Sequence, residues 1–397
     1  MLNERQKMNS HPNGAAQFAL RCNKAMDPKI TPPDAPKASQ RSRFAPAYRV
    51  LDEAIAAHAF PGCAFGVLSG GKVVLADALG RFTYDEASPA VTPKTVYDIA
   101  SITKVASTTA AAMLLYQRGL LDLETPLGDL LPGFVADRAA GDPARHVIIS
   151  HLLAHNSGLP GYVEFFRTAA TPEAILSACL GLPLEAEPGA RAEYSDPGFI
   201  LLGKALEMLT GESLSTWVQR EILSPLGLAA TGFCPPPSLQ SSIPPTEEDT
   251  TFRHRRIQGE VQDENAWILG GAAGHAGLFS NAPDLLRFAD EILAAAANAG
   301  RSRLFDAATI ELFARRQGPE GSSRALGWDT PSPDSTSGRH FSQRSIGHLG
   351  FSGCSLWIDQ EAGVAVVLLS NRTWPDRKSR LIRQVWPAFH DAVREAL

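Results

Sequence analysis

A serine and a lysine three residues apart form the first arrangement in this sequence that could carry out nucleophilic chemistry. The pattern S-x-x-K occurs twice, at Ser69–Lys72 and at Ser101–Lys104. A serine hydroxyl becomes a good nucleophile only when a neighbouring base removes its proton. In a helix, residues three positions apart share a face, so the lysine amine can reach the serine hydroxyl. The pattern predicts a nucleophilic serine wherever a helix carries it.

Sequence context favours the second pair. Ser69 lies between two short apolar runs, Cys63–Leu68 and Val73–Leu79, which predict a β-hairpin. Ser101 instead begins a helical stretch that continues to Gln117. The first N–H groups of a helix and the positive end of its dipole can stabilise developing negative charge. On this pattern alone, a simple N-cap role for Ser101 is an equally good interpretation.

Two further segments contain side chains that could act together with Ser101. Tyr194 and Asp196 come directly before an apolar helix, where a tyrosine could equally be a core anchor. The segment Ser345–Phe351 runs into a strand and contains His348 and Gly350. A glycine at position 350 allows a substrate to approach the backbone closely.

The elements that must position these residues change character along the chain. Residues 1–44 are polar, basic and rich in proline, which predicts a disordered extension. Strand-like segments near both ends flank a helical middle, so late strands can pair with early ones in one antiparallel sheet. The first and last helices would then cover one face of that sheet. The expected elements are a helix at 47–59, strands at 63–68 and 73–79, helices within 101–297, strands at 345–349, 355–359 and 364–370, and a helix at 377–397.

Composition narrows the function classes. The chain has 397 residues, 44% of them hydrophobic, and a formal charge of -5, which gives no basic surface for nucleic acid and no membrane-binding character. Its five cysteines are scattered without any C-x-x-C, which argues against a disulfide framework or a zinc site. Neither H-E-x-x-H nor G-x-S-x-G occurs, so zincin and α/β-hydrolase signatures are missing.

The order S-x-x-K, then Y-x-D, then H-x-G on a late strand resembles the S-x-x-K, Y-x-N and [K/H]-x-G motifs of class C β-lactamases, D,D-peptidases and family VIII carboxylesterases. These proteins belong to the serine β-lactamase and penicillin-binding-protein superfamily. The resemblance covers about Tyr48 to Phe389 and includes three further similar segments, at residues 149–160, 274–280 and 368–372.

The resemblance implies an α/β fold of the β-lactamase/transpeptidase kind, with an antiparallel sheet flanked by N- and C-terminal helices. An all-helical part lies beside it, and the site occupies the cleft between them. The expected domain spans residues 45–397, with an α/β part at 45–100 and 300–397 and a helical part at 101–299.

The same resemblance implies roles for individual residues. Ser101 attacks the substrate carbonyl, while Lys104 and Tyr194 move its proton. The backbone N–H groups of Ser101 and Phe351 form the oxyanion hole, and water then hydrolyses the acyl-enzyme with Tyr194 as base. No metal and no organic cofactor is implied.

Two positions depart from the family pattern. Asp196 stands where asparagine is usual, and a carboxylate favours a charged Lys104, which makes Tyr194 the expected base. His348 stands where lysine is common, so a permanent positive charge is absent. This absence favours ester or neutral amide substrates over β-lactams. A second H-x-G begins at His275, but it leads into an expected helix, so we assign His275 only to the lining of the site.

The sequence therefore predicts a serine hydrolase that acts on a small-molecule ester or amide, similar to carboxylesterases and with weak or no β-lactamase activity. One alternative is an amidase or D,D-peptidase acting on peptidoglycan fragments. Another is a non-hydrolytic sensor or scaffold, which the complete set of Ser101, Lys104 and Tyr194 disfavours. No signal peptide is recognised, so the expected location is the cytoplasm.

Overall fold

The computed structural model describes residues 38–333 and 335–397. The disorder expected for residues 1–37 lies outside this part. Helix α2 occupies Ala38–Arg43, where disorder was also expected. Contacts from distant parts of the chain hold it, because Arg43 Nε donates to the carbonyl of Ala396 at 2.7 Å and Gln40 Nε2 donates to Val74 at 3.0 Å.

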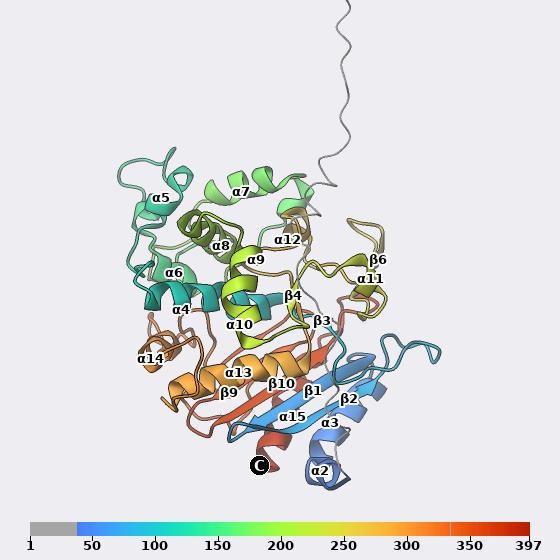
Figure 1. Ribbon diagram of the computed structural model, residues 1–397. Helices are drawn as coiled ribbons and strands as arrows, with labels where there is room; N and C mark the ends of the chain where they lie inside the picture. The colour runs from blue at the N-terminus through green and yellow to red at the C-terminus, as the bar shows by residue number, and fades with distance from the viewer. Residues whose placement is uncertain (1–37, 334) are drawn as a thin grey trace, which may run out of the picture.

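A five-stranded antiparallel sheet forms the lower layer in Figure 1. Its strands are β2 (Lys72–Gly80), β1 (Gly62–Ser69), β10 (Val364–Ser370), β9 (Ser355–Asp359) and β8 (Ser345–Leu349), in that order. The late strand β10 pairs with the early strand β1, with Val67 opposite Val366. The predicted strands and their pairing across the chain are therefore confirmed. β8 is an edge strand, and it carries His348.

Helices cover both faces of this sheet. On one face, α3 (Ala45–Ala56) packs with α15 (Ile382–Glu395) over buried aromatic residues such as Phe65 and Phe389, as predicted. On the other face, α13 (Ala282–Ala296) lies along β1 and β10 (Figure 1). α13 thus packs on the sheet, although residues 101–299 were expected to form the separate helical part.

Most of the remaining helices form a second layer above the sheet (Figure 1). Within the described residues, no helix is both long enough and apolar enough to cross a bilayer. The α-helices other than those already described are α4 (Ala110–Gln117), α5 (Leu127–Leu130), α6 (Ile149–Leu153), α7 (Pro172–Leu180), α8 (Asp196–Thr210), α9 (Leu214–Val218), α10 (Ser224–Leu226), α11 (Pro237–Gln240), α12 (Glu264–Ile268) and α14 (Ala307–Ala314). Two small sheets, β3 (Tyr97–Asp98), β7 (Leu278–Ser280) and β4 (Gly232–Phe233), and β5 (Glu247–Asp249) with β6 (Arg255–Ile257), complete the structure.

Candidate active site

Ser101 lies at a sharp bend between a strand and a helix. Strand β3 ends at Asp98, and after Ile99 the short 3₁₀ helix η1 (Ala100–Ile102) begins. Ala100 has a φ of 46°, a left-handed conformation that is unfavourable for alanine. The Asp98 carboxylate stabilises the bend by accepting the N–H groups of Ala100 at 2.8 Å and of Gln262 at 2.7 Å. Ser101 is therefore presented at the start of a helix, as predicted.

The helix after Ser101 is not a regular α-helix. A π-helical segment, η2 (Lys104–Thr109), separates η1 from α4. The uninterrupted helix expected from Ser101 to Gln117 is wrong in this respect. π-Helical segments within helices occur often at functional sites, and this one begins at Lys104.

Lys104 is buried and makes three hydrogen bonds. Its Nζ donates to Ser101 Oγ at 3.2 Å, to Asp196 Oδ1 at 2.6 Å and to the carbonyl oxygen of His275 at 3.0 Å. Burial alone would lower the pKa of the ammonium, but the charge of Asp196 and the contacts with Tyr194 outweigh burial and raise this pKa. Lys104 is therefore a charged ammonium at neutral pH, held by Asp196 as the sequence predicted.

Asp196 is available for this ion pair because another residue caps its helix. The N-cap of α8 is Ser195, whose Oγ accepts the N–H of Gly198 at 3.0 Å and donates to the carbonyl of Pro160 at 2.7 Å. The Asp196 side chain is thus free to face Lys104.

Replacing Asp196 with asparagine should shift the pH dependence of the reaction. The carboxylate raises the pKa of Lys104 and also acts to raise that of Tyr194. Without its negative charge, the Lys104–Tyr194 pair should lose its proton at lower pH. We expect the limb of the kcat/KM profile that reports this proton to move to lower pH in Asp196→Asn, measured with a neutral ester.

The matched control is Asp263→Asn. Asp263 pairs with His275 instead of Lys104, so this variant should move the same limb less. Superimposable profiles for wild type and Asp196→Asn would show that the carboxylate does not govern the pair.

Tyr194 lies against Lys104, with the Nζ 4.8 Å from the centre of the tyrosine ring. Burial raises the pKa of Tyr194, although the Lys104 charge and the contacts with Lys104 and Ser101 act to lower it. The positive charge beside the tyrosine is present as predicted. Tyr194 is nevertheless not an ionised base in the resting protein, because its raised pKa keeps the phenol protonated. Tyr194 can therefore accept a proton only if it passes its own proton on.

Two neutral histidines pack around Tyr194. The ring centres of His155 and His348 lie 4.6 Å and 5.9 Å from that of Tyr194. Burial and the charges of Lys104 and Arg324 lower the pKa of His348 to about 3, so this residue is uncharged, as expected. Its Nδ1 lies 2.7 Å from the carbonyl oxygen of Leu349.

His155 fixes the loop that carries Tyr194. Its Nδ1 accepts the N–H of Ser195 at 3.0 Å, and burial followed by the charge of Arg324 lowers its pKa well below the usual range. The sequence did not indicate this role, because nothing in the spacing links position 155 to position 194. We classify His155 as a positioning residue.

The turn after β8 lies against the residues that precede Ser101. A side chain at Gly350 would place its Cβ 2.4 Å from the carbonyl oxygen of Ile99, so only glycine fits. The Ser352 hydroxyl also donates to the carbonyl of Asp98 at 2.7 Å. Gly350 therefore allows a close approach of protein backbone, which the sequence had attributed to substrate. Phe351 is 49% exposed, and its N–H has no acceptor within the part of the chain that is described.

His275 contacts the site through its backbone. The expectation that its segment leads directly into a helix is wrong, because the segment first enters the short strand β7, which pairs with β3 just upstream of Ser101. The His275 carbonyl accepts from Lys104, while its Nε2 lies 2.9 Å from Asp263 Oδ1. Burial would raise the pKa of Asp263, but His275 and the other contacts lower it to about 2. His275 thus lies beside Lys104, and its ring contacts the carboxylate of Asp263.

Arg324 is a site residue that the sequence did not indicate. Its guanidinium carbon lies 5.3 Å from the centre of the Tyr194 ring, and its charge helps to lower the pKa of both His155 and His348. His348 is neutral, as predicted, so it does not supply the permanent positive charge that lysine gives at this position in the family pattern. A different part of the chain supplies that charge.

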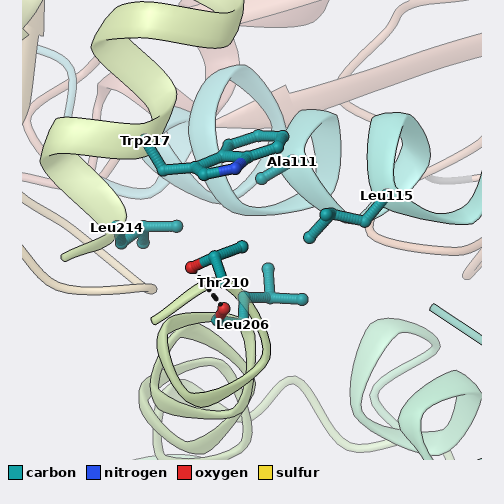
Figure 2. Close-up of a pocket in the computed structure, with 6 residues that line it drawn as sticks. All are labelled: Ala111, Leu115, Leu206, Thr210, Leu214 and Trp217. Atoms are coloured by element: carbon teal, nitrogen blue, oxygen red, sulfur yellow. Dashed lines mark hydrogen bonds between the residues drawn. The ribbon is translucent and has the colours of Figure 1, made fainter. Parts of the chain in front are cut away.

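A small apolar pocket in the helical layer is separate from this chemistry (Figure 2). α4, α8 and α9 line it with Ala111, Leu115, Leu206, Thr210, Leu214 and Trp217. Its hydroxyl group, on Thr210, already donates to the carbonyl of Leu206 at 2.8 Å. The pocket is a gap in the packing of α4, α8 and α9, and none of the candidate site residues lines it.

The chain is similar to known proteins over most of its length. The family model described as Beta-lactamase matches residues 48–386. An N-acetylmuramyl-L-alanine amidase of Bacillus subtilis (strain 168) is 30% identical, with 89% of this chain and 86% of that protein covered. A putative D-alanyl-D-alanine carboxypeptidase of Salmonella typhi is 31% identical, with 71% and 70% covered.

Solved structures show the same fold at lower identity. EstCE1, a hydrolase with promiscuous acyltransferase activity, has a TM-score of 0.73 at 23% identity, covering 90% of this chain and 100% of that one. A class C β-lactamase from Rhodobacter sphaeroides has a TM-score of 0.67 at 20% identity, covering 88% and 99%. The predicted α/β architecture is confirmed by these likenesses and by the sheet itself.

Proposed function

Because the chain belongs to the beta-lactamase family of serine hydrolases, we propose that it cleaves amide and ester bonds through an acyl-enzyme on Ser101. The observation that carries this proposal is the contact of Ser101 Oγ with the buried Lys104 ammonium at 3.2 Å, beside Tyr194. A nucleophile, a fixed positive charge and a proton carrier thus meet at one helix start.

In the first step, Ser101 Oγ forms a bond with the substrate carbonyl carbon. The negative charge that develops on the carbonyl oxygen is stabilised by the N–H groups of Ser101 and Phe351. One such donor contributes about 3 kcal/mol to transition-state stabilisation in serine hydrolases. The N–H of Ser101 belongs to the first turn of η1, where helix N–H groups have no acceptor within the helix.

Tyr194 moves the proton in this scheme. It takes the Ser101 proton while its own hydroxyl proton passes to the leaving nitrogen or oxygen, so the bond to the leaving group breaks without a free amide or alkoxide ion. Lys104 stays charged and stabilises the oxygen of Tyr194 during the transfer. Water then attacks the acyl-enzyme, and the same proton movements in reverse restore Ser101.

This relay suits amide substrates, because an amine leaves only after it receives a proton. The relatives at 30% and 31% identity are named as an N-acetylmuramyl-L-alanine amidase and a putative D-alanyl-D-alanine carboxypeptidase, and both names describe cleavage of an amide bond to alanine. We propose amides of this class as the natural substrates. Simple esters, the substrates first expected from the sequence, need less help with the leaving group and should also be cleaved.

The test is a substrate comparison with the purified protein. We expect release of free L-alanine from N-acetylmuramyl-L-alanine and of p-nitrophenol from p-nitrophenyl butyrate, neither of them with Ser101→Ala. Ester hydrolysis without any amine release would restrict the activity to esters. No turnover of any amide, ester or β-lactam would overturn the proposed function and favour a non-hydrolytic role.

A further inference from the structure

We propose that Arg324 binds a carboxylate of the substrate and thereby makes the protein selective for anionic amides and esters. This inference rests on the proposed function, which it narrows to one substrate class. Three features of the described residues support it: the poor pairing of the guanidinium, the rigidity of the segment that carries it, and the charges around Tyr194.

The Arg324 guanidinium is largely removed from water but poorly compensated. Its side chain is 23% exposed, and its ion pair within the described residues is a long one of 4.0 Å to Asp329. That Asp329 oxygen already accepts the Ser323 hydroxyl at 2.6 Å and the Thr330 N–H at 3.0 Å. A desolvated cation is costly unless an anion or good acceptors compensate its charge. The planar guanidinium can bind a carboxylate through two parallel hydrogen bonds.

A buried turn fixes the position of Arg324. The N–H of Gly327 donates to the carbonyl of Leu153 at 2.8 Å, and a Cβ at Gly327 would lie 2.0 Å from Thr109 Oγ1. Asp329 and Gly347 exchange both backbone hydrogen bonds at 2.9 Å, which attaches this segment to β8 directly before His348. Arg324 is thus placed by the same strand that carries the H-x-G segment.

The other charges near Tyr194 leave Arg324 as the group for an incoming anion. His155 and His348 are neutral, and the Lys104 ammonium is already paired with Asp196 at 2.6 Å. On the Lys104 side, Asp196 and Asp263 would repel a second carboxylate. An anionic substrate is therefore directed toward the Arg324 side of the tyrosine ring.

The experiment compares matched neutral and anionic esters. One pair is p-nitrophenyl hydrogen suberate and its methyl ester, in which the carboxylate or its methyl ester lies in the acyl group. The other pair is 3-carboxyphenyl butyrate and its methyl ester, in which the carboxylate or its methyl ester lies in the leaving group. We expect Arg324→Gln to lower kcat/KM for the anionic member of one pair by about 10- to 100-fold, the scale of one charged hydrogen-bonded interaction. The neutral members should lose less kcat/KM than the anionic members, because they feel only the changed charge beside Tyr194 and present no carboxylate to the guanidinium. The readout is therefore the ratio of anionic to neutral kcat/KM within each pair.

Two further variants separate this interaction from general effects. Arg324→Lys should retain part of the preference for anions, because it keeps the charge but not the two-pronged geometry. Arg220→Gln, which removes the same charge from an exposed pair with Glu212, should behave as wild type. An equal decrease for neutral and anionic members, or no decrease in either pair, would overturn the role of Arg324. Failure of wild type to cleave any of the four esters would instead contradict the proposed function.

Discussion

Replacing Ser101 with alanine is expected to lower kcat by a factor on the order of 10⁵ to 10⁶, as in other serine hydrolases that lose their nucleophile. Without Oγ no atom is in place to form the acyl-enzyme, so only the slow attack of water on a bound substrate is left. The fold should survive, because Lys104, the hydrogen-bond partner of Oγ, keeps its bonds to Asp196 and to the His275 carbonyl. The measurement is kcat with p-nitrophenyl butyrate, together with the melting temperature.

The chain supplies its own control for this variant. Ser69 begins the other S-x-x-K pattern but lies at the end of β1, in a hairpin with β2. Ser69→Ala should keep wild-type kcat. If Ser69→Ala loses activity while Ser101→Ala keeps it, the assignment of the nucleophile is wrong.

Replacing Tyr194 with phenylalanine is expected to lower kcat by about 10²- to 10⁴-fold, the usual contribution of a positioned proton carrier. The aromatic ring stays, so its packing on His155 and its contact with the Lys104 ammonium should be kept. Amide hydrolysis should fall more than ester hydrolysis, because the amine depends on the proton that Tyr194 delivers. The measurement is kcat for N-acetylmuramyl-L-alanine and for p-nitrophenyl butyrate in parallel.

Tyr116→Phe is the matched control, since it removes a tyrosine hydroxyl from α4, where the ring packs against Phe313. This variant should keep wild-type rates. Activity of Tyr194→Phe within a few fold of wild type would contradict the relay and would leave Lys104 to take the Ser101 proton directly.

The sheet could be predicted because its signals are local. The run Val364–Ser370 is apolar, rich in β-branched residues and bounded by a glycine, and the structure has β10 over the same residues. The choice of Ser101 over Ser69 was also local, since it depended on the helix that follows. The contact of Lys104 with Asp196 was predicted from charge once both residues had been assigned to one site.

The features that were missed depend on contacts between distant parts of the chain. Arg324 reaches Tyr194 because Asp329 pairs with Gly347 on β8, and no pattern near residue 324 indicates that pairing. His155 is linked to Tyr194 in the same non-local way, through the N–H of Ser195. The place of α13 on the sheet was missed because its apolar stripe fits a sheet or another helix equally well.

The central claim is that Ser101 becomes covalently acylated, and covalent labelling tests it most directly. A fluorophosphonate should react with the wild-type protein at Ser101, with fluoride as the leaving group. Intact-mass measurement should then show one adduct, and peptide mapping should place it on Ser101. The Ser101→Ala protein should show none. An adduct on Ser69, or an active wild-type protein that forms no adduct at Ser101, would contradict the account.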